Sequence, residues 1–222
     1  MGASRDFDSS ASDKGVLSSG YNPESSDDYS LAFWYNGGDN ASGDAEHGKA
    51  IFGSERGGTV TGSFGMKSGI PGLARYNSTW LRGPVATTDI ADDTWHHVVL
   101  ANTGSAETAK IYVDTVEEAD ADSTIDWPSN PSKMYFESLM VIQHPSNLYT
   151  DGKVAWVSAW DKTLSADEVK EIYRNPLAVP GNMILCFPLF GNDSPEVDFA
   201  GSRTITLTGT SEAFLGPPIH LF

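Results

Sequence analysis

The sequence predicts an all-β protein, an antiparallel sandwich of two sheets with one short helix. Segments in which apolar and polar residues alternate with period two recur along the 222 residues. The 22 glycines and 12 prolines are spread between these segments, as expected for many short strands joined by turns. A chain of this length suits one large β domain, so we expect residues 1–222 to form a single domain.

The clearest strand is Tyr29–Asn36, in which Tyr29, Leu31, Phe33 and Tyr35 alternate onto one face. Two further segments, 94–103 and 108–114, flank the turn sequence GSAE and are expected to pair as a hairpin. The other expected strands are residues 49–54, 59–64, 73–81, 137–143, 152–161, 182–190 and 202–209.

One segment, TLSADEVKEIYRNP, predicts the helix near residues 165–174. Ser165 is a good N-cap, and Glu168 completes a capping box with it. Val169, Ile172 and Tyr173 share one helix face and are expected to point toward the core. Pro176 prevents the helix from continuing.

Charge and composition argue against several classes of partner. The chain carries 14 Lys and Arg against 30 Asp and Glu, a net charge of −16. Such a surface repels phosphate backbones and anionic lipids, so we expect neither nucleic acid nor membrane as a partner. No apolar run reaches the length of a membrane span. Cys186 is the one cysteine; it lies in an apolar run and is expected to be buried and inert.

Five segments, taken in order, carry a family resemblance. They are RDFDSSASDKGV, DDYSLAFWYN, DDTWHHVVL with AKIYVD, TDGKVAWVSAWDKTLSADEVKEIYRNP, and MILCFPLFGNDSPEVDFAGSRTITLTG. Together they resemble the concanavalin A-like lectin/glucanase superfamily, and within it the laminin-G-like, pentraxin-like jelly roll. The resemblance implies a concanavalin A-like antiparallel β-sandwich. It leaves function open, because this fold carries lectins, adhesion modules, hydrolase domains and virion proteins.

The sequence departs from the family pattern at two positions. Asp114 is followed by Thr115 where relatives have a turn glycine, so a longer connection is expected there. Ala155 stands where relatives often carry an acidic residue, which implies that a calcium ligand has been lost.

Calcium is nevertheless the one cofactor that the sequence allows; no other is expected. Calcium prefers several oxygen ligands in loops, and the candidate ligands are Asp39, Asn40, Asp44 and Asp151. A zinc site at His96 and His97 is not expected. Neighbouring residues of a strand point to opposite faces, so these two imidazoles cannot bind one ion together.

The expected chemistry is binding rather than catalysis. No strand carries the alternating carboxylates of a glucanase, so a glycoside hydrolase is the least favoured of three hypotheses, and we expect no enzyme activity. Aromatic side chains near turns could instead form a sugar platform; the candidates are Tyr76, Trp80, Trp127 and Tyr149. Trp34, Trp95 and Trp160 match core positions of the family and are expected to be buried.

The apolar C-terminal tail, residues 212–222, is unusual because chain ends are normally polar. It is either a last edge strand or a segment that docks on a partner, with the candidate contacts Phe214, Leu215, Ile219, Leu221 and Phe222. The N-terminal sequence has no apolar export signal, and the surface is acidic and poor in cysteine.

These features favour a non-catalytic structural or adhesion protein on the exterior of a phage virion, of the capsid decoration or fibre type. Its partners would be capsid or other virion proteins, sister subunits and host-surface glycans. The alternative is an extracellular carbohydrate-binding, lectin-like module.

Overall fold

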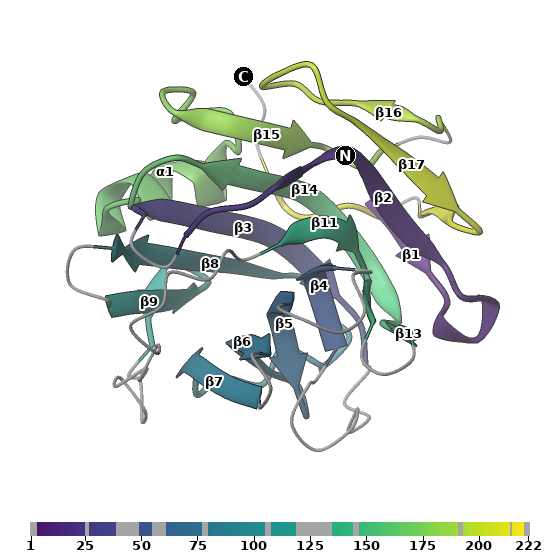
Figure 1. The fold of residues 1–222 in the computed structure, drawn as a ribbon, viewed down its shortest axis with the longest axis horizontal. Helices are drawn as coiled ribbons and strands as arrows, with labels where there is room; N and C mark the ends of the chain where they lie inside the picture. Colours follow the sequence, from purple (N-terminus) through teal and green to yellow (C-terminus); the bar gives the residue numbers. More distant parts are fainter. Residues whose placement is uncertain are drawn as a thin grey trace.

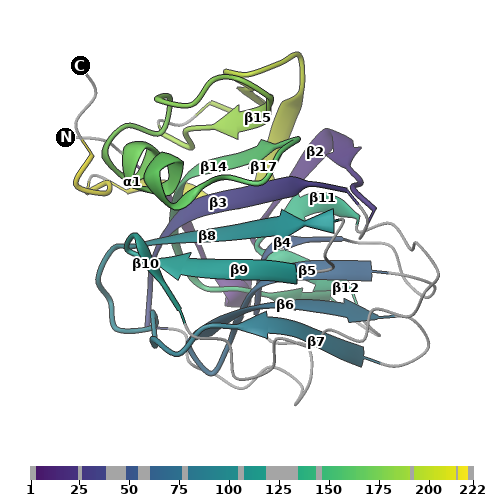
Figure 2. The same cartoon turned by 90° about the vertical axis from the view of Figure 1, so that its left-hand side faces the viewer.

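Two antiparallel sheets pack face to face in the computed structural model, as the sequence predicts (Figures 1 and 2). The structure describes residues 4–24, 27–38, 49–54, 61–76, 80–104, 108–118, 135–143, 147–190, 193–213 and 215–219. Among these residues, no helix has the length and apolar character that crossing a membrane requires.

Sheet A has the strand order β10-β9-β8-β3-β14-β1-β18, and β15 also pairs with β14. Its strands are β10 (Val116–Glu117), β9 (Thr108–Val113), β8 (His96–Thr103), β3 (Tyr29–Asn36), β14 (Gly152–Trp160), β1 (Ser4–Phe7), β18 (Ser211–Ala213) and β15 (Met183–Phe187). The hairpin predicted from residues 94–114 is confirmed as the antiparallel pair β8 and β9.

Sheet B has the strand order β16-β17-β2-β11-β4-β5-β6-β7. Its strands are β16 (Glu196–Val197), β17 (Thr204–Thr208), β2 (Lys14–Tyr21), β11 (Phe136–Leu139), β4 (Lys49–Gly53), β5 (Thr61–Lys67), β6 (Ile70–Tyr76) and β7 (Trp80–Val85). A small third sheet pairs β12 (Val141–Gln143) with β13 (Asn147–Tyr149).

The main core lies between sheets A and B. Tyr29, Leu31, Phe33 and Tyr35 of β3 all enter it, which confirms the alternation expected from the sequence. Phe33 lies 5.3 Å from Phe64 of sheet B, measured between ring centroids. Burial of such apolar surface is the dominant favourable term in folding, so this layer specifies which way each strand faces.

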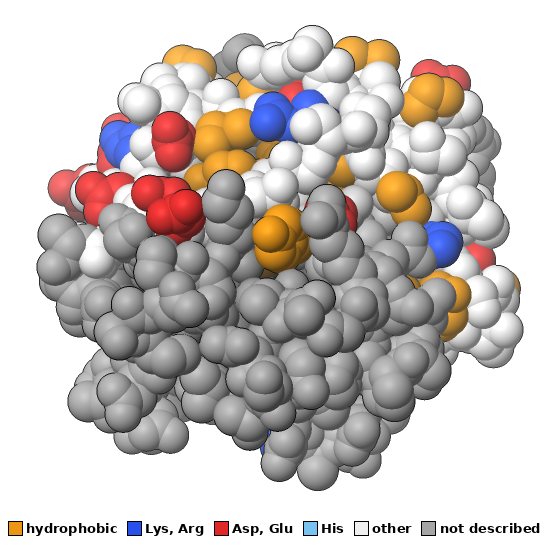
Figure 3. All heavy atoms as spheres, viewed as in Figure 1, with side chains coloured by type: hydrophobic (Ala, Val, Ile, Leu, Met, Phe, Trp, Pro, Cys, Tyr) orange, Lys and Arg blue, Asp and Glu red, His pale blue; other side chains and the backbone are white. Residues whose placement is uncertain are grey.

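The helix α1 (Ala166–Arg174) covers the outer face of sheet A, beside β14 and β3 (Figures 1 and 2). Its capping box between Ser165 and Glu168 is confirmed. Val169 and Ile172 are buried, but they pack on the outside of the sheet, against Val99 and Trp160, rather than between the sheets. On the face shown in Figure 3, described acidic side chains gather most densely around α1.

Two expected strands were placed wrongly. Residues 73–81 are not one strand, because β6 ends at Tyr76 and β7 begins at Trp80. Residues 137–143 divide at Met140, whose φ of 60° turns the chain out of sheet B and into the small sheet. The Met140 amide donates to the Ile51 carbonyl, which holds this break in place.

The connection after Asp114 is short, contrary to the expectation from the missing glycine. β9 ends at Val113 and β10 begins at Val116, so Asp114 and Thr115 alone form the turn. Both have positive φ, 49° and 75°, as a type I′ hairpin requires. The Asp114 carboxylate accepts from the His97 amide and lies 2.7 Å from His96 Nδ1, and these bonds hold the turn without glycine.

Candidate functional site

The most distinctive surface feature is a small cleft on the segment that leaves β15 and enters sheet B. Its volume is about 160 Å³. We call it the aromatic cleft, and its lining residues are Pro188, Phe190, Asp193, Pro195, Glu196, Val197 and Phe199.

The local sequence explains why apolar side chains stay exposed here. Pro188 follows β15 directly and has no N–H to donate to a neighbouring strand. Pro195 precedes β16, which is only two residues long. Without longer strands, the intervening apolar residues are not drawn into the core, and Phe199, Val197 and Phe190 are 57%, 64% and 40% exposed.

The two phenylalanines form adjoining walls. The rings of Phe190 and Phe199 are 6.3 Å apart, with an angle of 87° between their planes. Phe190 also contacts Trp156 of β14, at 5.9 Å between ring centroids. Edge-to-face packing of this kind holds aromatic rings in a defined orientation, so the cleft presents a fixed apolar surface to solvent.

A buried ion pair lies beneath the cleft. Arg5 Nη2 is 3.4 Å from Glu196 Oε1, and Arg5 also donates to the carbonyl of Asp193. Glu196 Oε2 accepts from the Leu189 amide at 3.1 Å. Burial raises the pKa of Glu196 to about 7, although the neighbouring guanidinium acts in the opposite direction. The pair links β1 to the chain segment that carries the phenylalanines.

The chemistry of the cleft is that of a small ligand site. Such sites combine apolar and aromatic walls with a few polar groups that fix orientation. Asp193 is exposed at the cleft and supplies a carboxylate acceptor. The volume is below the roughly 300 Å³ of a typical drug-sized pocket, so the cleft suits one ring or one side chain.

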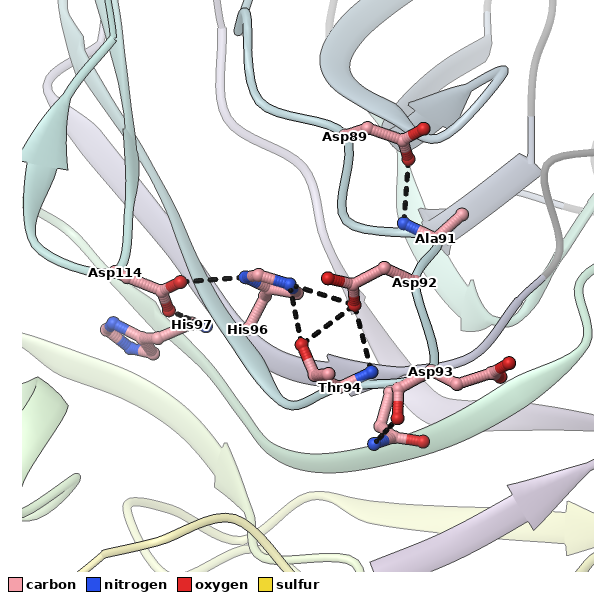
Figure 4. A network of polar contacts seen from close by, with 9 residues as sticks. Asp89, Ala91, Asp92, Asp93, Thr94, His96, His97 and Asp114 are labelled. Carbon is pink, nitrogen blue, oxygen red and sulfur yellow. Dashed lines mark hydrogen bonds and ion pairs between the residues drawn. The ribbon is translucent and has the colours of Figure 1, made fainter.

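The neighbouring histidines have separate structural roles, as expected from their positions. Both ring nitrogens of His96 face carboxylates, Nδ1 toward Asp114 at 2.7 Å and Nε2 toward Asp92 at 3.2 Å (Figure 4). His97 lies on the other face and packs 5.0 Å from the Trp34 ring. Within the described ranges, no group of three or more His, Cys, Asp or Glu residues is placed to hold a metal ion.

Asp151, one of the four calcium candidates, forms hydrogen bonds within the chain. Its carboxylate accepts from the amide and the hydroxyl of Ser9, which begins the short 3₁₀ turn after β1. Asp39, Asn40 and Asp44 lie outside the described residues.

Of the four sugar-platform candidates, Tyr149 alone has a side chain that the structure describes. Tyr149 is half-buried in β13. Trp127 and the side chains of Tyr76 and Trp80 lie outside what the structure describes. Trp34 and Trp160 are buried, as expected, and Trp95 is half-buried.

The tail divides into an edge strand and a returning segment. β18 pairs with β1 at the edge of sheet A. Leu215 is exposed, whereas Ile219 packs against the cluster that contains Trp34 and Trp156. Phe214, Leu221 and Phe222 lie outside the described part of the chain.

The aromatic cleft was missed by sequence reasoning, although a signal was present. Phe190, Val197 and Phe199 stand among Pro, Gly, Asn, Asp and Ser, in the run FPLFGNDSPEVDFAG. Apolar residues in a segment dense in turn formers cannot all join a strand ladder. Such a segment is therefore a candidate for apolar exposure.

Comparison with known proteins places the sequence among β-sandwich proteins. The family model described as "Concanavalin A-like lectin/glucanases superfamily" matches residues 8–170. A search of the curated proteins found no match.

Two solved structures resemble the chain over nearly its whole length. A Bacteroides ovatus protein assigned as carbohydrate-binding has a TM-score of 0.65 and 18% identity, over 99% of this chain and 62% of its own. This chain therefore spans about three fifths of that protein's length. The heptameric SAP-like pentraxin of Limulus polyphemus has a TM-score of 0.54 and 11% identity, over 94% and 96% of the two chains. Identities this low show the fold alone.

Proposed function

Because the chain belongs to the concanavalin A-like lectin/glucanases superfamily, we propose that it is a non-catalytic module that binds carbohydrate in the aromatic cleft. The observation that carries this proposal is the pair of exposed, mutually fixed rings of Phe190 and Phe199 beside the carboxylate of Asp193. The B. ovatus protein, assigned as carbohydrate-binding, adds support at the level of the shared fold.

The cleft matches the two kinds of surface that a sugar presents. The C–H groups of a pyranose or furanose ring form an apolar face, which packs on an aromatic ring. The hydroxyl groups at the ring edge both donate and accept hydrogen bonds, and a carboxylate such as Asp193 accepts from them. A neutral ligand also avoids the repulsion that a net charge of −16 imposes on anions.

The state of Glu196 favours binding over hydrolysis. A glycoside hydrolase needs two carboxyl groups that can both reach the scissile bond. Glu196 is 7% exposed, and its two oxygens are engaged by Arg5 and by the Leu189 amide. It is therefore not free to protonate a ligand oxygen, and Asp193 alone cannot provide both functions.

The test is a glycan array followed by calorimetric titration of the best binder. Phe199→Ala should weaken binding at least about tenfold, because it removes the more exposed ring and the stacking surface it provides. Val116→Ala is the matched control, since Val116 is 61% exposed on β10, on the far edge of sheet A. Both variants should keep the wild-type near-ultraviolet circular dichroism.

Three results would contradict the proposal. The first is an array without any bound glycan, and the second is equal affinity of wild type and Phe199→Ala. The third is turnover of a bound glycan, which would show an enzyme instead of a binding module.

Attachment of the module to a virion stays a proposal, resting on the features that the sequence provides. Ile219 packs against the chain's own cluster around Trp34 and Trp156, so this residue is already engaged within the domain. Leu215, which is 68% exposed, remains available to a partner. Light scattering of the full chain and of a chain ending at Ala213, which keeps β18, tests self-association through the tail. A full-length oligomer that becomes a folded monomer on truncation would support it, and two monomers would remove it.

A further inference from the structure

A second, larger depression lies on the outside of sheet B, between β2 and β11. Its volume is about 390 Å³, within the range of ligand pockets. We call it the polar hollow; its lining residues are Val16, Leu17, Ser18, Ser19, Gly20, Asn22, Glu137 and Ser138.

An irregularity in strand pairing creates the hollow. Tyr21 pairs with Phe136, and Val16 pairs with Ser138. The chain therefore advances by five residues in β2 where it advances by two residues in β11. The extra residues of β2 bulge away from β11 and leave the space between them.

Gly20 keeps the space open. A Cβ at this position would lie 2.6 Å from Glu137 Cγ and 3.2 Å from Asn22 Oδ1. Any other residue would therefore push its side chain against the carboxylate arm that borders the hollow.

Two polar side chains of the hollow can still form hydrogen bonds with a ligand. Within the described part of the chain, neither the Ser19 hydroxyl nor the Asn22 amide has a hydrogen-bond partner, and both residues are exposed. The carboxylate of Glu137 is half-buried beside them, and its Oε2 accepts from the Ser54 hydroxyl at 3.5 Å. Hydroxyl, amide and carboxylate groups together both donate and accept, which matches the hydroxyl groups of a sugar.

The register of sheet B joins the hollow to the aromatic cleft. Val197, which lines the cleft, pairs with Thr204 of β17. The Thr204 amide donates to the hydroxyl of Ser18, which lines the hollow. Because side chains that are paired across neighbouring strands share a face, Val197, Thr204 and Ser18 form a row on the outer face. Two strand spacings separate its ends, about 10 Å, which is more than one sugar ring spans.

We propose that the ligand is a linear oligosaccharide of at least two sugar units, one stacked in the aromatic cleft and the next ones hydrogen-bonded in the polar hollow. This inference rests on the proposed function of the cleft and adds the class of ligand and its direction across β16, β17 and β2. Phe190 and Phe199 stack on the first sugar unit. Ser19, Asn22 and Glu137 form hydrogen bonds with the following units, so affinity increases with the number of units.

The test is titration with gluco-, xylo-, manno- and arabino-oligosaccharides of one to five units. For the sugar type that binds, affinity should rise with each unit up to about three and then level off. The double variant Ser19→Ala/Asn22→Ala should remove that rise, at roughly three- to tenfold per lost hydrogen bond, and leave monosaccharide affinity unchanged. Gly20→Ala should act in the same direction by narrowing the hollow, and Ser211→Ala on β18 serves as a surface control.

The outcomes separate the two proposals. Binding that depends on Phe199 but is independent of chain length, or a length dependence that survives in the double variant, overturns the oligosaccharide inference and leaves the cleft as the site. Absence of binding by any unit length, together with an empty glycan array, overturns the carbohydrate function and this inference with it.

Discussion

The guanidinium of Arg5 and the carboxylate of Glu196 meet at 3.4 Å although 191 residues separate them in the chain. Both side chains are almost completely buried. Arg5 comes from an inner strand of sheet A and Glu196 from the edge strand of sheet B, so the pair joins the two sheets directly under the aromatic cleft.

Removal of Arg5 alone should destabilise the protein strongly. Above about pH 7, where Glu196 is ionised, Arg5→Met leaves its buried carboxylate without a partner, and such losses cost roughly 3–5 kcal/mol. In the double variant Arg5→Met/Glu196→Leu no charge is left unpaired, so much of this loss should be recovered. Urea denaturation of the wild type, Arg5→Met, Glu196→Leu and the double variant measures the coupling. A loss in the double variant equal to the sum of the losses in the two single variants would show that the pair has no net interaction.

Glu196 should make the protein less stable as the pH rises. An unfolded glutamate ionises near pH 4.5, whereas Glu196 in the folded protein does so near pH 7. Between these values the folded state holds the extra proton, so its contribution is complete below about pH 4.5 and is lost as the pH rises through 7. The expected loss is roughly 1–2 kcal/mol after allowance for solvent screening. Glu196→Gln should not show this loss of stability. If the stability of Glu196→Gln changes with pH in the same way as that of the wild type, Glu196 is not the group responsible.

His97 should contribute in the opposite direction. Burial lowers the pKa of His97 to about 3, against 6.5 in an unfolded chain. Between these values only the unfolded state binds the proton, so stability falls as the pH drops below 6.5, by at most about 1.4 kcal/mol per unit. The two slopes offset each other between pH 4.5 and 6.5. In Glu196→Gln the His97 effect should remain alone, so this variant should lose stability as the pH falls below 6.5. In His97→Phe the Glu196 effect should remain alone, so this variant should gain stability as the pH falls below 7. Denaturation at each pH measures both.

Asp151 should matter for stability whether or not calcium is present. Asp151→Asn removes a charged acceptor from the amide and hydroxyl of Ser9, and we expect a loss of about 1.5–3 kcal/mol. Thermal melts with calcium and with a chelator provide the measurement. A wild-type melt that falls with the chelator to the value of Asp151→Asn would instead identify Asp151 as a calcium ligand.

Thr115→Gly should stabilise the protein by roughly 1 kcal/mol. Thr115 adopts a φ of 75°, which is unfavourable for a β-branched side chain and free of strain for glycine. Thr206→Gly is the matched control; it places glycine inside β17 at an exposed position and should destabilise. Destabilisation by both substitutions would show that contacts of the Thr115 side chain outweigh its backbone strain.

Local patterns predicted most of the fold. The alternation in residues 29–36 and the capping box at Ser165 are properties of neighbouring residues, and both are confirmed. The break at Met140 could not be predicted, because a positive φ at methionine depends on partners far away, such as the Ile51 carbonyl. The tight turn at Asp114 was missed for the same reason, since bonds from β8 replace the glycine that the local rule requires.

The candidate site was missed for a different reason. Exposed aromatics were expected at turns such as those near Tyr76 and Tyr149, but the cleft arises where β15 ends and β16 is too short to cover its neighbours. The polar hollow depends on a shift in pairing between strands that are more than a hundred residues apart. A single sequence does not contain the register of such strands.

The pairing of β1 with β18 has a mechanical consequence. Ser4 lies opposite Ala213 in an antiparallel pair, and the hydrogen bonds of such a pair run perpendicular to the strands. A load that pulls residues 4 and 213 apart acts on these bonds one at a time, like the opening of a zipper, instead of shearing them together. A module tethered at both ends would therefore yield at this seam under low force, while β14, β3 and β8 keep their order.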